Sequence, residues 1–336
     1  MTSLSKYTTL KVGGPATRLV HARSEEELIS AISTADDAGE QVLILGGGSN
    51  VLVSDTGFNG VVIRVETTGN SYEIDACSGG MLQVSAGDDW DEFVQFTLDK
   101  GLANLESLSG IPGTIGGAPI QNIGAYGHEA SEVIARVRVY DRHEKKVKTF
   151  AAADCDFSYR SSIFKKSAGR YVILDVTFQL RHGVESLPIM YEELASALGV
   201  KIGDRVDTKL VRETVLKLRS KKGMLEGEVA SAGSFFTNPI ISAQDAAKLP
   251  ETAPRWNQPD GRVKTSAAWL MEHAGVHKGD ALGGAAISPK HVLALSNSGD
   301  ATAEDIVKLA RSARDKVREV FGITLEAEVA FVGIKL

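Results

Sequence analysis

The chain has 336 residues, a net charge of −6 and an ordinary globular mixture of 43% hydrophobic and 24% charged residues. That length predicts two or three domains, and that composition excludes a wholly disordered chain and a coiled coil. The acidic balance argues against a nucleic-acid partner, because binding phosphates requires clustered Lys and Arg. The apolar runs are far shorter than the roughly 20 residues of a membrane helix, and the N-terminus has no apolar signal segment. We therefore expect a cytoplasmic protein without membrane insertion.

The first 70 residues predict a small α+β unit. Ser24 is expected to begin a helix that ends before Gly39, because Ser24 and Glu27 have the spacing of a capping box. The continuous apolar run Gln41–Leu45 predicts a buried strand, and a second strand is expected at Val61–Val65.

A second α+β unit is predicted to end near residue 183. Residues 72–76 and 82–86 alternate as a hairpin would, and further strands are expected at residues 133–139, 146–150 and 171–180. Asp88 is expected to cap a helix that Gly101 ends. The predicted apolar face of that helix is formed by Trp90, Phe93, Val94 and Leu98.

The C-terminal third predicts a separate domain after a boundary near Gly223, because the following residues are rich in Gly, Pro, Asn and Ser. Helices are expected at Asp207–Lys221, with Leu210 on its apolar face, at Thr265–Ala274, and at Thr302–Phe321, with Val320 on its apolar face. The chain is predicted to close with a strand, Ile323–Val332.

The motifs for common nucleotide and metal sites are absent from the sequence. It contains no G-x-G-x-x-G after a strand, no P-loop and no H-E-x-x-H. His273 and His277 are four residues apart, either as two solvated histidines near a helix end or as a pair of metal ligands. A metal site needs a third ligand and none stands out, so no metal is expected.

Two glycine-rich segments are the most informative feature. The first follows a buried strand and consists of Gly46, Gly47, Gly48, Ser49 and Asn50. Such a turn can direct N–H groups at an anion, although an ordinary turn between strands has the same composition. The second segment, 110–127, carries apolar Ile111 and Ile115 between glycines, which is typical of a loop pressed against a flat ligand or of a packed Ω-loop. Together the two segments indicate a dinucleotide ligand held without a Rossmann turn.

Leu45–Leu52 and Gly110–Gly127 closely resemble the two flavin-binding segments of the UDP-N-acetylenolpyruvoylglucosamine reductase family. Tyr159–Lys165, Ala232–Pro239 and Leu325–Val329 look like the three active-site motifs of that family. The resemblance extends over nearly the whole chain, with the motifs in the family's order and spacing.

The resemblance implies an α+β fold: a two-subdomain FAD-binding fold of the vanillyl-alcohol oxidase/PCMH type plus a C-terminal α/β substrate-binding domain. The implied domains are residues 1–70 with the C-terminal strand 323–336, residues 71–222, and residues 223–322 as the substrate-binding domain. It also implies non-covalent FAD, NADPH as hydride donor, and UDP-N-acetylglucosamine enolpyruvate as the substrate that is reduced to UDP-N-acetylmuramate for peptidoglycan. The residues implied to bind the cofactor are Gly46, Gly47, Gly48, Ser49, Asn50, Ile111, Pro112, Gly113, Thr114, Ile115, Gly116, Gly117, Gln121, Asn122, Gly124, Ala125 and Tyr126.

The catalytic residues implied by the family motifs are Arg160, Ser234 and Glu328. Hydride addition leaves negative charge that spreads into the substrate carboxylate, and the guanidinium of Arg160 would stabilise that charge most in the transition state. Ser234 would donate a proton to the strongly basic carbon. Glu328 can help only when it is protonated or paired with Arg160, because two carboxylates repel each other.

The residues implied to bind substrate are Tyr159, Tyr191, Lys222, Asn238 and His291. Tyr191 matches a tyrosine that closes over the substrate in one subtype of the family. Lys222 and Asn238 match positions that approach the substrate phosphates. His291 stands where some members have glutamine, which leaves that contact open.

Two other functions are compatible with the same fold. A flavin oxidase would be the rival enzyme, but many of these attach FAD covalently to a histidine near the first glycine segment, and no histidine lies between Val42 and Gly60. A flavin- or nucleotide-sugar-binding module without activity is the other alternative. The retention of Arg160, Ser234 and Glu328 together argues against it.

Overall fold

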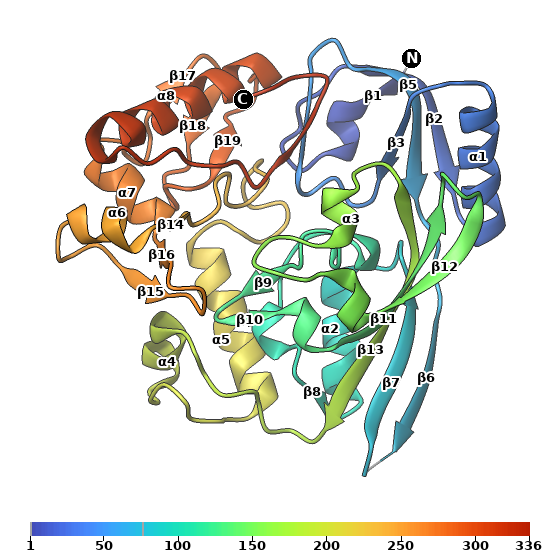
Figure 1. The fold of residues 1–336 in the computed structure, drawn as a ribbon, viewed down its shortest axis with the longest axis horizontal. Coiled ribbons are helices and arrows are strands. Elements are labelled where there is room, and N and C mark those ends of the chain that lie inside the picture. Colours follow the sequence, from blue (N-terminus) through green and yellow to red (C-terminus); the bar gives the residue numbers. More distant parts are fainter. Residues whose placement is uncertain (1, 76) are drawn as a thin grey trace. The chain divides into compact units, whose positions relative to one another are not determined.

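The computed structural model describes residues 2–75 and 77–336, and Figure 1 shows its helices and strands. The chain divides into two compact units. Unit 1 consists of Thr2, Ala16–Gly48 and Asn59–Glu226, and unit 2 of Ser3–Pro15, Ser49–Phe58 and Gly227–Leu336. The long C-terminal part of unit 2 thus begins near the boundary predicted at Gly223, while the three-domain division stays a prediction.

Two larger sheets organise unit 1. The first has the order β1-β2-β5-β3, formed by Thr2–Ser3, Pro15–Ala22, Phe58–Val65 and Val42–Leu45. The second has the order β12-β11-β13-β7-β6, formed by Lys146–Ala151, Ile134–Asp141, Tyr171–His182, Gly79–Ser85 and Asn70–Asp75, and β8 (Leu102–Ala103) pairs with β13. The predicted hairpin and the predicted strands are therefore confirmed, except that residue 76 lies outside the described residues.

Helix α1 (Glu25–Asp37) begins where the sequence predicts. The Ser24 hydroxyl accepts a hydrogen bond from the N–H of Glu27 at 3.2 Å, which satisfies one of the open donors of the first turn. The helix is also fixed to β11, because the Arg138 guanidinium donates to the Glu25 carboxylate at 2.6 Å and the hydroxyls of Ser33 and Tyr140 lie 2.9 Å apart.

Helix α2 (Trp90–Asp99) is capped by Asp89, so the expected cap at Asp88 is wrong by one residue. The Asp89 carboxylate accepts from the N–H of Glu92 at 2.9 Å, whereas the Asp88 carboxylate accepts from the N–H of Gly69 at 3.1 Å. The predicted apolar face is buried, and the ring of Phe93 packs 4.9 Å from that of Phe178 on β13.

The remaining elements of unit 1 carry the loops of interest. They are β9 (Gly124–Ala125), β10 (His128–Glu129), α3 (Ile163–Lys166), α4 (Glu192–Leu198) and α5 (Thr208–Lys221). Asp207 caps α5 by accepting from the N–H groups of Lys209 and Leu210. The side chain of Leu210 is 46% exposed, which corrects its expected place on the apolar face. At the start of a helix, one step in register moves a side chain to the solvent side.

Unit 2 is built from short strands, the 3-10 helix Leu4–Tyr7 and three α-helices within its described residues. The helices are α6 (Ala243–Lys248), α7 (Ala267–His273) and α8 (Ala303–Phe321). One small sheet has the order β14-β16-β15 (Ile240–Ile241, Val263–Thr265, Arg255–Asn257), another the order β17-β18-β19 (Ala281–Leu282, Ala285–Ile287, Leu295–Asn297), and β4 (Val51–Val53) pairs in parallel with β20 (Ala330–Val332).

The end of the chain differs from the predicted strand Ile323–Val332. Only β20 forms a ladder, although Ile323, Leu325 and Val329 are buried as the alternation requires. The apolar face of α8 is confirmed apart from Val320, which is 56% exposed in the last turn. Among the described residues, no helix combines the length and apolarity needed to span a membrane.

Candidate active site

The two predicted flavin-binding segments meet within unit 1. A Cβ atom on Gly46 would lie 2.6 Å from Oγ1 of Thr114, and a Cβ atom on Gly47 would lie 2.9 Å from Cα of Gly113. The second approach is between two backbones, which only glycine permits at that distance. The structure therefore brings together two segments that are far apart in the sequence.

The middle of the second segment is held by its own backbone hydrogen bonds. The N–H of Ile115 donates to the Asp88 carbonyl at 2.9 Å, and the N–H of Gly116 to the Ala86 carbonyl at 2.8 Å. The Ile115 side chain is fully buried in the core of unit 1. These hydrogen bonds and the buried Ile115 side chain fix the loop to the core of unit 1. The contact of Ile115 and Gly116 with the cofactor stays a prediction.

The start of the second segment is clamped by charged side chains from α2 and α5. The Asp91 carboxylate accepts from the N–H of Gly110 at 2.6 Å and from the Arg212 guanidinium at 2.6 and 2.8 Å. On the other side, Arg219 donates to the Gly110 carbonyl at 2.9 Å. Burial lowers the pKa of Arg219, because desolvation disfavours the charged guanidinium. The hydrogen bond to the Gly110 carbonyl offsets part of that cost.

Arg160, the predicted charge-stabilising residue, lies against the same segment. Its guanidinium donates to the carbonyl of Gly124 at 2.8 Å and to that of Asn122 at 3.4 Å. Its backbone has φ +52, an uncommon value for a residue with a side chain. Asn122 is fully buried, and its amide group donates to the Glu129 carboxylate at 2.6 Å. The guanidinium is thus oriented by the backbone of the predicted cofactor loop.

Two predicted substrate residues lie near the end of that loop. The rings of Tyr126 and Tyr191 meet edge to face with centroids 5.6 Å apart. Burial raises the pKa of Tyr126 to about 12, so its phenol is neutral. Lys222 forms an ion pair with Glu193 in α4, two residues after Tyr191. Tyr191 itself is 41% exposed.

Unit 2 brings the other two predicted catalytic residues together. The N–H of Glu328 donates to the Phe235 carbonyl at 2.8 Å, and Phe236 forms an antiparallel bridge with Ala327. Ser234 and Glu328 are therefore on adjacent backbone segments. The side-chain amide of Asn50 donates to the Glu328 carbonyl at 3.2 Å. Asn50, a predicted cofactor-binding residue, therefore lies next to Glu328.

The last predicted substrate residues also lie in unit 2. The side-chain oxygen of Asn238 accepts from the N–H of Ala267 at 2.9 Å, at the start of α7, and the carbonyl of His291 accepts from the N–H of Ala294 at 3.0 Å. The described residues contain no group of three His, Cys, Asp or Glu that could hold a metal ion. His273 instead stacks on Trp269, with ring centroids 3.8 Å apart.

Sequence reasoning missed the residues that support these loops. Asp91 and Arg212, which clamp Gly110, are 121 residues apart in the sequence. Glu106, which accepts from the N–H of Leu187 at 2.7 Å, and His128, whose Nε2 lies 2.9 Å from the Pro188 carbonyl oxygen, likewise have no local motif. Only long-range contact identifies such residues, so the sequence carries no signal for them.

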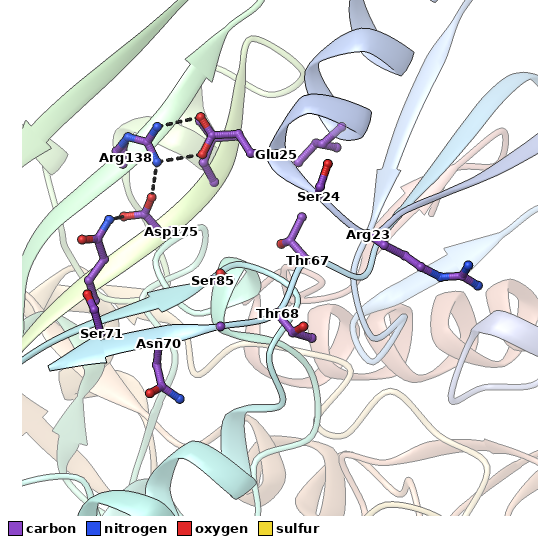
Figure 2. A pocket seen from close by; sticks show the side chains of 14 residues that line it. Arg23, Ser24, Glu25, Thr67, Thr68, Asn70, Ser71, Ser85, Arg138 and Asp175 are labelled. Carbon is purple, nitrogen blue, oxygen red and sulfur yellow. Dashed lines mark hydrogen bonds and ion pairs between the residues drawn. The ribbon is translucent and has the colours of Figure 1, made fainter.

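A polar pocket of about 470 Å³ lies elsewhere in unit 1, and Figure 2 shows it from close by. The Arg138 guanidinium at its wall donates to Glu25 and to Asp175, both at 2.6 Å, and Gln83 donates to Asp175 at 2.9 Å. The predicted site residues are not among those that line it. The charges of Arg138, Glu25 and Asp175 are paired with each other, and this network joins α1 to the second sheet.

Comparison with known families first defines the class of the protein. The family described as "FAD binding domain" matches residues 16–149. That range contains the glycine segments that meet at Gly47 and Gly113, and the absence of a Cβ at Gly47 leaves the close backbone approach that a flavin cradle needs. The chain is a flavoprotein with FAD as its cofactor, and the predicted fold class is confirmed.

A second family match and full-length relatives identify the family. Residues 225–332 match "UDP-N-acetylenolpyruvoylglucosamine reductase, C-terminal domain". The chain is 52% identical to the UDP-N-acetylenolpyruvoylglucosamine reductase of Cutibacterium acnes, over 98% of this chain and 89% of that relative. It is 48% identical to the Thermobifida fusca protein of the same name, over 99% of this chain and 97% of the relative. The crystal structure of the Thermus caldophilus reductase matches with a TM-score of 0.69 and 28% identity, covering 98% of this chain and 97% of that one. The chain belongs to the UDP-N-acetylenolpyruvoylglucosamine reductase family.

Proposed function

We propose that this chain uses NADPH to reduce UDP-N-acetylglucosamine enolpyruvate to UDP-N-acetylmuramate, a peptidoglycan precursor. The observation that carries this proposal is similarity to named reductases over nearly the whole chain. When bound, FAD would supply the chemistry of hydride transfer from NADPH to the substrate, and the glycine segments of unit 1 would hold it. NADPH and nucleotide sugars are cytoplasmic metabolites, so we place the protein in the cytoplasm.

The segments of unit 1 are assigned to the cofactor and to charge stabilisation. Gly47 and Gly113 allow two backbones to approach closely, which suits a cradle for the FAD diphosphate. Arg160, oriented by the Gly124 carbonyl, would stabilise the negative charge that develops on the substrate carboxylate.

The adjacent segments of unit 2 are assigned to proton delivery. Ser234 would donate the proton to the substrate carbon next to the one that receives the hydride. The backbone of Glu328 lies beside the segment that carries Ser234, because the N–H of Glu328 is bonded to the Phe235 carbonyl. Glu328 would help to stabilise charge when protonated or paired with Arg160.

Binding of the nucleotide sugar is assigned to Tyr159, Tyr191, Lys222, Asn238 and His291. A diphosphate needs cations and hydroxyl donors, which Lys222 and the tyrosines provide. Lys222 is paired with Glu193, so a bound phosphate would have to compete with that carboxylate.

NADPH consumption tests the function directly. We expect oxidation of NADPH that depends on the enolpyruvyl sugar and yields UDP-N-acetylmuramate, and a visible flavin spectrum that bleaches on reduction. A flavin oxidase of the same fold would instead consume oxygen and ignore the sugar. NADPH-independent oxygen consumption would therefore overturn the proposal in favour of that alternative.

A further inference from the structure

The backbone just before Tyr191 is held by two buried side chains. Glu106, in the 3-10 helix Glu106–Leu108, is fully buried, and its carboxylate accepts from the N–H of Leu187 at 2.7 Å. His128, in β10, is 7% exposed, and its Nε2 lies 2.9 Å from the carbonyl oxygen of Pro188. A carboxylate and an imidazole therefore form hydrogen bonds with the backbone of two consecutive residues of this segment.

The residues that follow pack on the end of the flavin-binding segment. Gly127 has φ +91, and a Cβ atom there would lie 2.7 Å from Cβ of Met190. The Tyr191 ring meets the Tyr126 ring at 5.6 Å. Between Pro188 and Met190, Ile189 exchanges backbone hydrogen bonds with Asp204 and Gly203, both at 2.9 Å. His128 is therefore one of several groups that together fix the backbone leading to Tyr191.

Both ring nitrogens of His128 face atoms that can only accept hydrogen bonds. Nδ1 lies 2.9 Å from the Glu132 carboxylate, and Nε2 lies 2.9 Å from the Pro188 carbonyl. An imidazolium donates from both nitrogens and satisfies both contacts, whereas a neutral imidazole donates from one. After deprotonation, one ring nitrogen has no hydrogen and turns a lone pair toward the carboxylate or the carbonyl, so one of the two contacts is weakened.

We propose that His128 is a positioning residue for the nucleotide sugar: as an imidazolium it fixes Pro188 and thereby holds Tyr191 in place to meet the substrate. This inference rests on the proposed function, because Tyr191 is assigned to the substrate only there. His128 does not itself touch the substrate or the cofactor in this proposal.

The surroundings of His128 favour the charged form. Burial, the largest single cause, lowers the pKa of His128, but the hydrogen bonds to Glu132 and to the Pro188 carbonyl, together with the charges of Glu132 and Glu106, raise it by more. The pKa is therefore raised above 6.5. On the segment's side, the Arg205 guanidinium donates to the Ser186 carbonyl at 2.8 Å, and the segment itself carries the carboxylates of Glu185, Glu192 and Glu193. The hydrogen bond from protonated His128 to the Pro188 carbonyl is fully present below the ordinary pKa of histidine. It is lost as the pH rises through the raised pKa of His128.

The first test measures KM for the enolpyruvyl sugar against pH. In the wild type KM should rise as the pH passes the raised pKa of His128. His128→Gln should raise KM about tenfold at low pH, as expected for loss of a charge-assisted buried hydrogen bond, and should show a flatter profile. Reduction of FAD by NADPH should be unchanged in the same variant.

Glu132→Gln is the conservative variant that separates positioning from packing. Its amide nitrogen can donate to Nδ1 of a neutral His128, which then donates from Nε2 to Pro188, while its amide oxygen can still accept from the N–H of Glu129. KM should stay low at every pH in this variant. His21→Gln is the matched control, because His21 also lies 2.9 Å from a carboxylate, that of Glu66, and should keep the wild-type profile.

A readout besides activity is amide hydrogen exchange of the peptide 184–193. At a fixed pH near 6 it should be faster in His128→Gln than in the wild type and unchanged in His21→Gln. Equal KM profiles and equal exchange in His128→Gln and the wild type would overturn the inference, as would a parallel loss of both half-reactions. A wild type without sugar-dependent NADPH oxidation would instead refute the proposed function, while the exchange comparison would still decide whether His128 holds the segment.

Discussion

Ser234 and Glu328 lie on adjacent backbone segments because the N–H of Glu328 and the carbonyl of Phe235 share a hydrogen bond of 2.8 Å. Backbone hydrogen bonding fixes the relative position of the two segments more firmly than a flexible loop could. The rings of Phe235 and Phe236, both 1% exposed, anchor the segment that carries Ser234 in the core of unit 2. The predicted acid is therefore carried by a rigid part of the molecule.

Ser234→Ala should separate the two half-reactions. If the hydroxyl donates the proton, reduction of FAD by NADPH should be nearly normal, and reoxidation by the enolpyruvyl sugar should slow by about 10²–10⁴-fold. Ser234→Cys keeps a proton donor and should retain more activity than the alanine variant. Stopped-flow absorbance measures both steps. Equal slowing of both would make Ser234 a structural residue or part of the NADPH site.

Gly47→Ala should destabilise unit 1 and lower its FAD content. The added Cβ would lie 2.9 Å from Cα of Gly113, and a crowded backbone contact typically costs about 1–3 kcal/mol. Gly117→Ala is the control, because a Cβ there meets nothing within 4 Å, and stability should change by less than about 0.5 kcal/mol. Urea unfolding of the FAD-free proteins compares the two. Equal stability of Gly47→Ala and the wild type would refute the required close approach.

The sequence allowed site residues to be predicted because their motifs are continuous stretches of chain. Ser234 and its two phenylalanines are one such stretch, and Gly46–Asn50 is another. The supporting residues were not predictable in this way. His128 holds Pro188 and Glu106 holds Leu187 across separations of 60 and 81 residues, so only the folded chain shows the pairing.

At the scale of elements, Asp141 joins three consecutive parts of the second sheet. It ends β11 and is fully buried. Its carboxylate accepts from Arg170, just before β13, at 2.8 Å, and from Lys148 in β12 at 2.7 Å. The Arg170 guanidinium first, and Lys148 with it, hold the pKa of Asp141 well below its usual range. One side chain thus ties the edges of three strands together.

Asp141→Asn should lower the free energy of unfolding by about 2 kcal/mol at neutral pH, because hydrogen bonds to a buried charge are lost. The lowered pKa means that Asp141 contributes stability above its unfolded-state pKa, and that this contribution is lost as the pH falls below about 4. The variant should therefore lose less stability than the wild type on acidification.

Asp37→Asn is the matched control for that change. The Lys145–Asp37 ion pair is 57% and 64% exposed, and an exposed pair contributes about 0–1 kcal/mol. Urea unfolding at neutral and acidic pH gives both comparisons. Equal losses in the two variants would show that Asp141 behaves as an ordinary surface carboxylate.

The sequence predicted element types well but some ends poorly. Asp88 and Asp89 are equally suitable caps by composition, and the choice depends on the bond from Gly69 to Asp88, which brings in a distant turn. The strand at Ile323–Val332 has the right alternation of buried residues, yet the ladder forms only where β4 is its partner, at Ala330–Val332. Periodicity identifies the buried face, whereas a partner strand decides where pairing begins.

For the whole molecule, the order of motifs was sufficient to predict the FAD-binding and C-terminal domains. It was not sufficient to place the short segments Ser3–Pro15 and Ser49–Phe58, which belong to unit 2 with the C-terminal part of the chain. The family resemblance groups the C-terminal strand with residues 1–70, and β4 and β20 are the parts of those two regions that pair. The resemblance did not separate Ser49–Phe58 from Ala16–Gly48, which belong to different units. A division of that kind depends on tertiary packing that no local pattern encodes.

Acid precipitation of the purified protein should release all of its FAD. Covalent attachment needs a nucleophilic side chain next to the flavin, and residues 41–60 contain no His, Cys or Tyr. In the second predicted flavin-binding segment, burial raises the pKa of Tyr126 to about 12, which keeps its phenol protonated and unreactive. Burial likewise raises the pKa of Cys155 to about 12. The yellow colour should therefore appear in the supernatant after precipitation and leave a colourless pellet. A yellow pellet that survives washing in denaturant would show a covalent bond to the chain and would contradict this prediction.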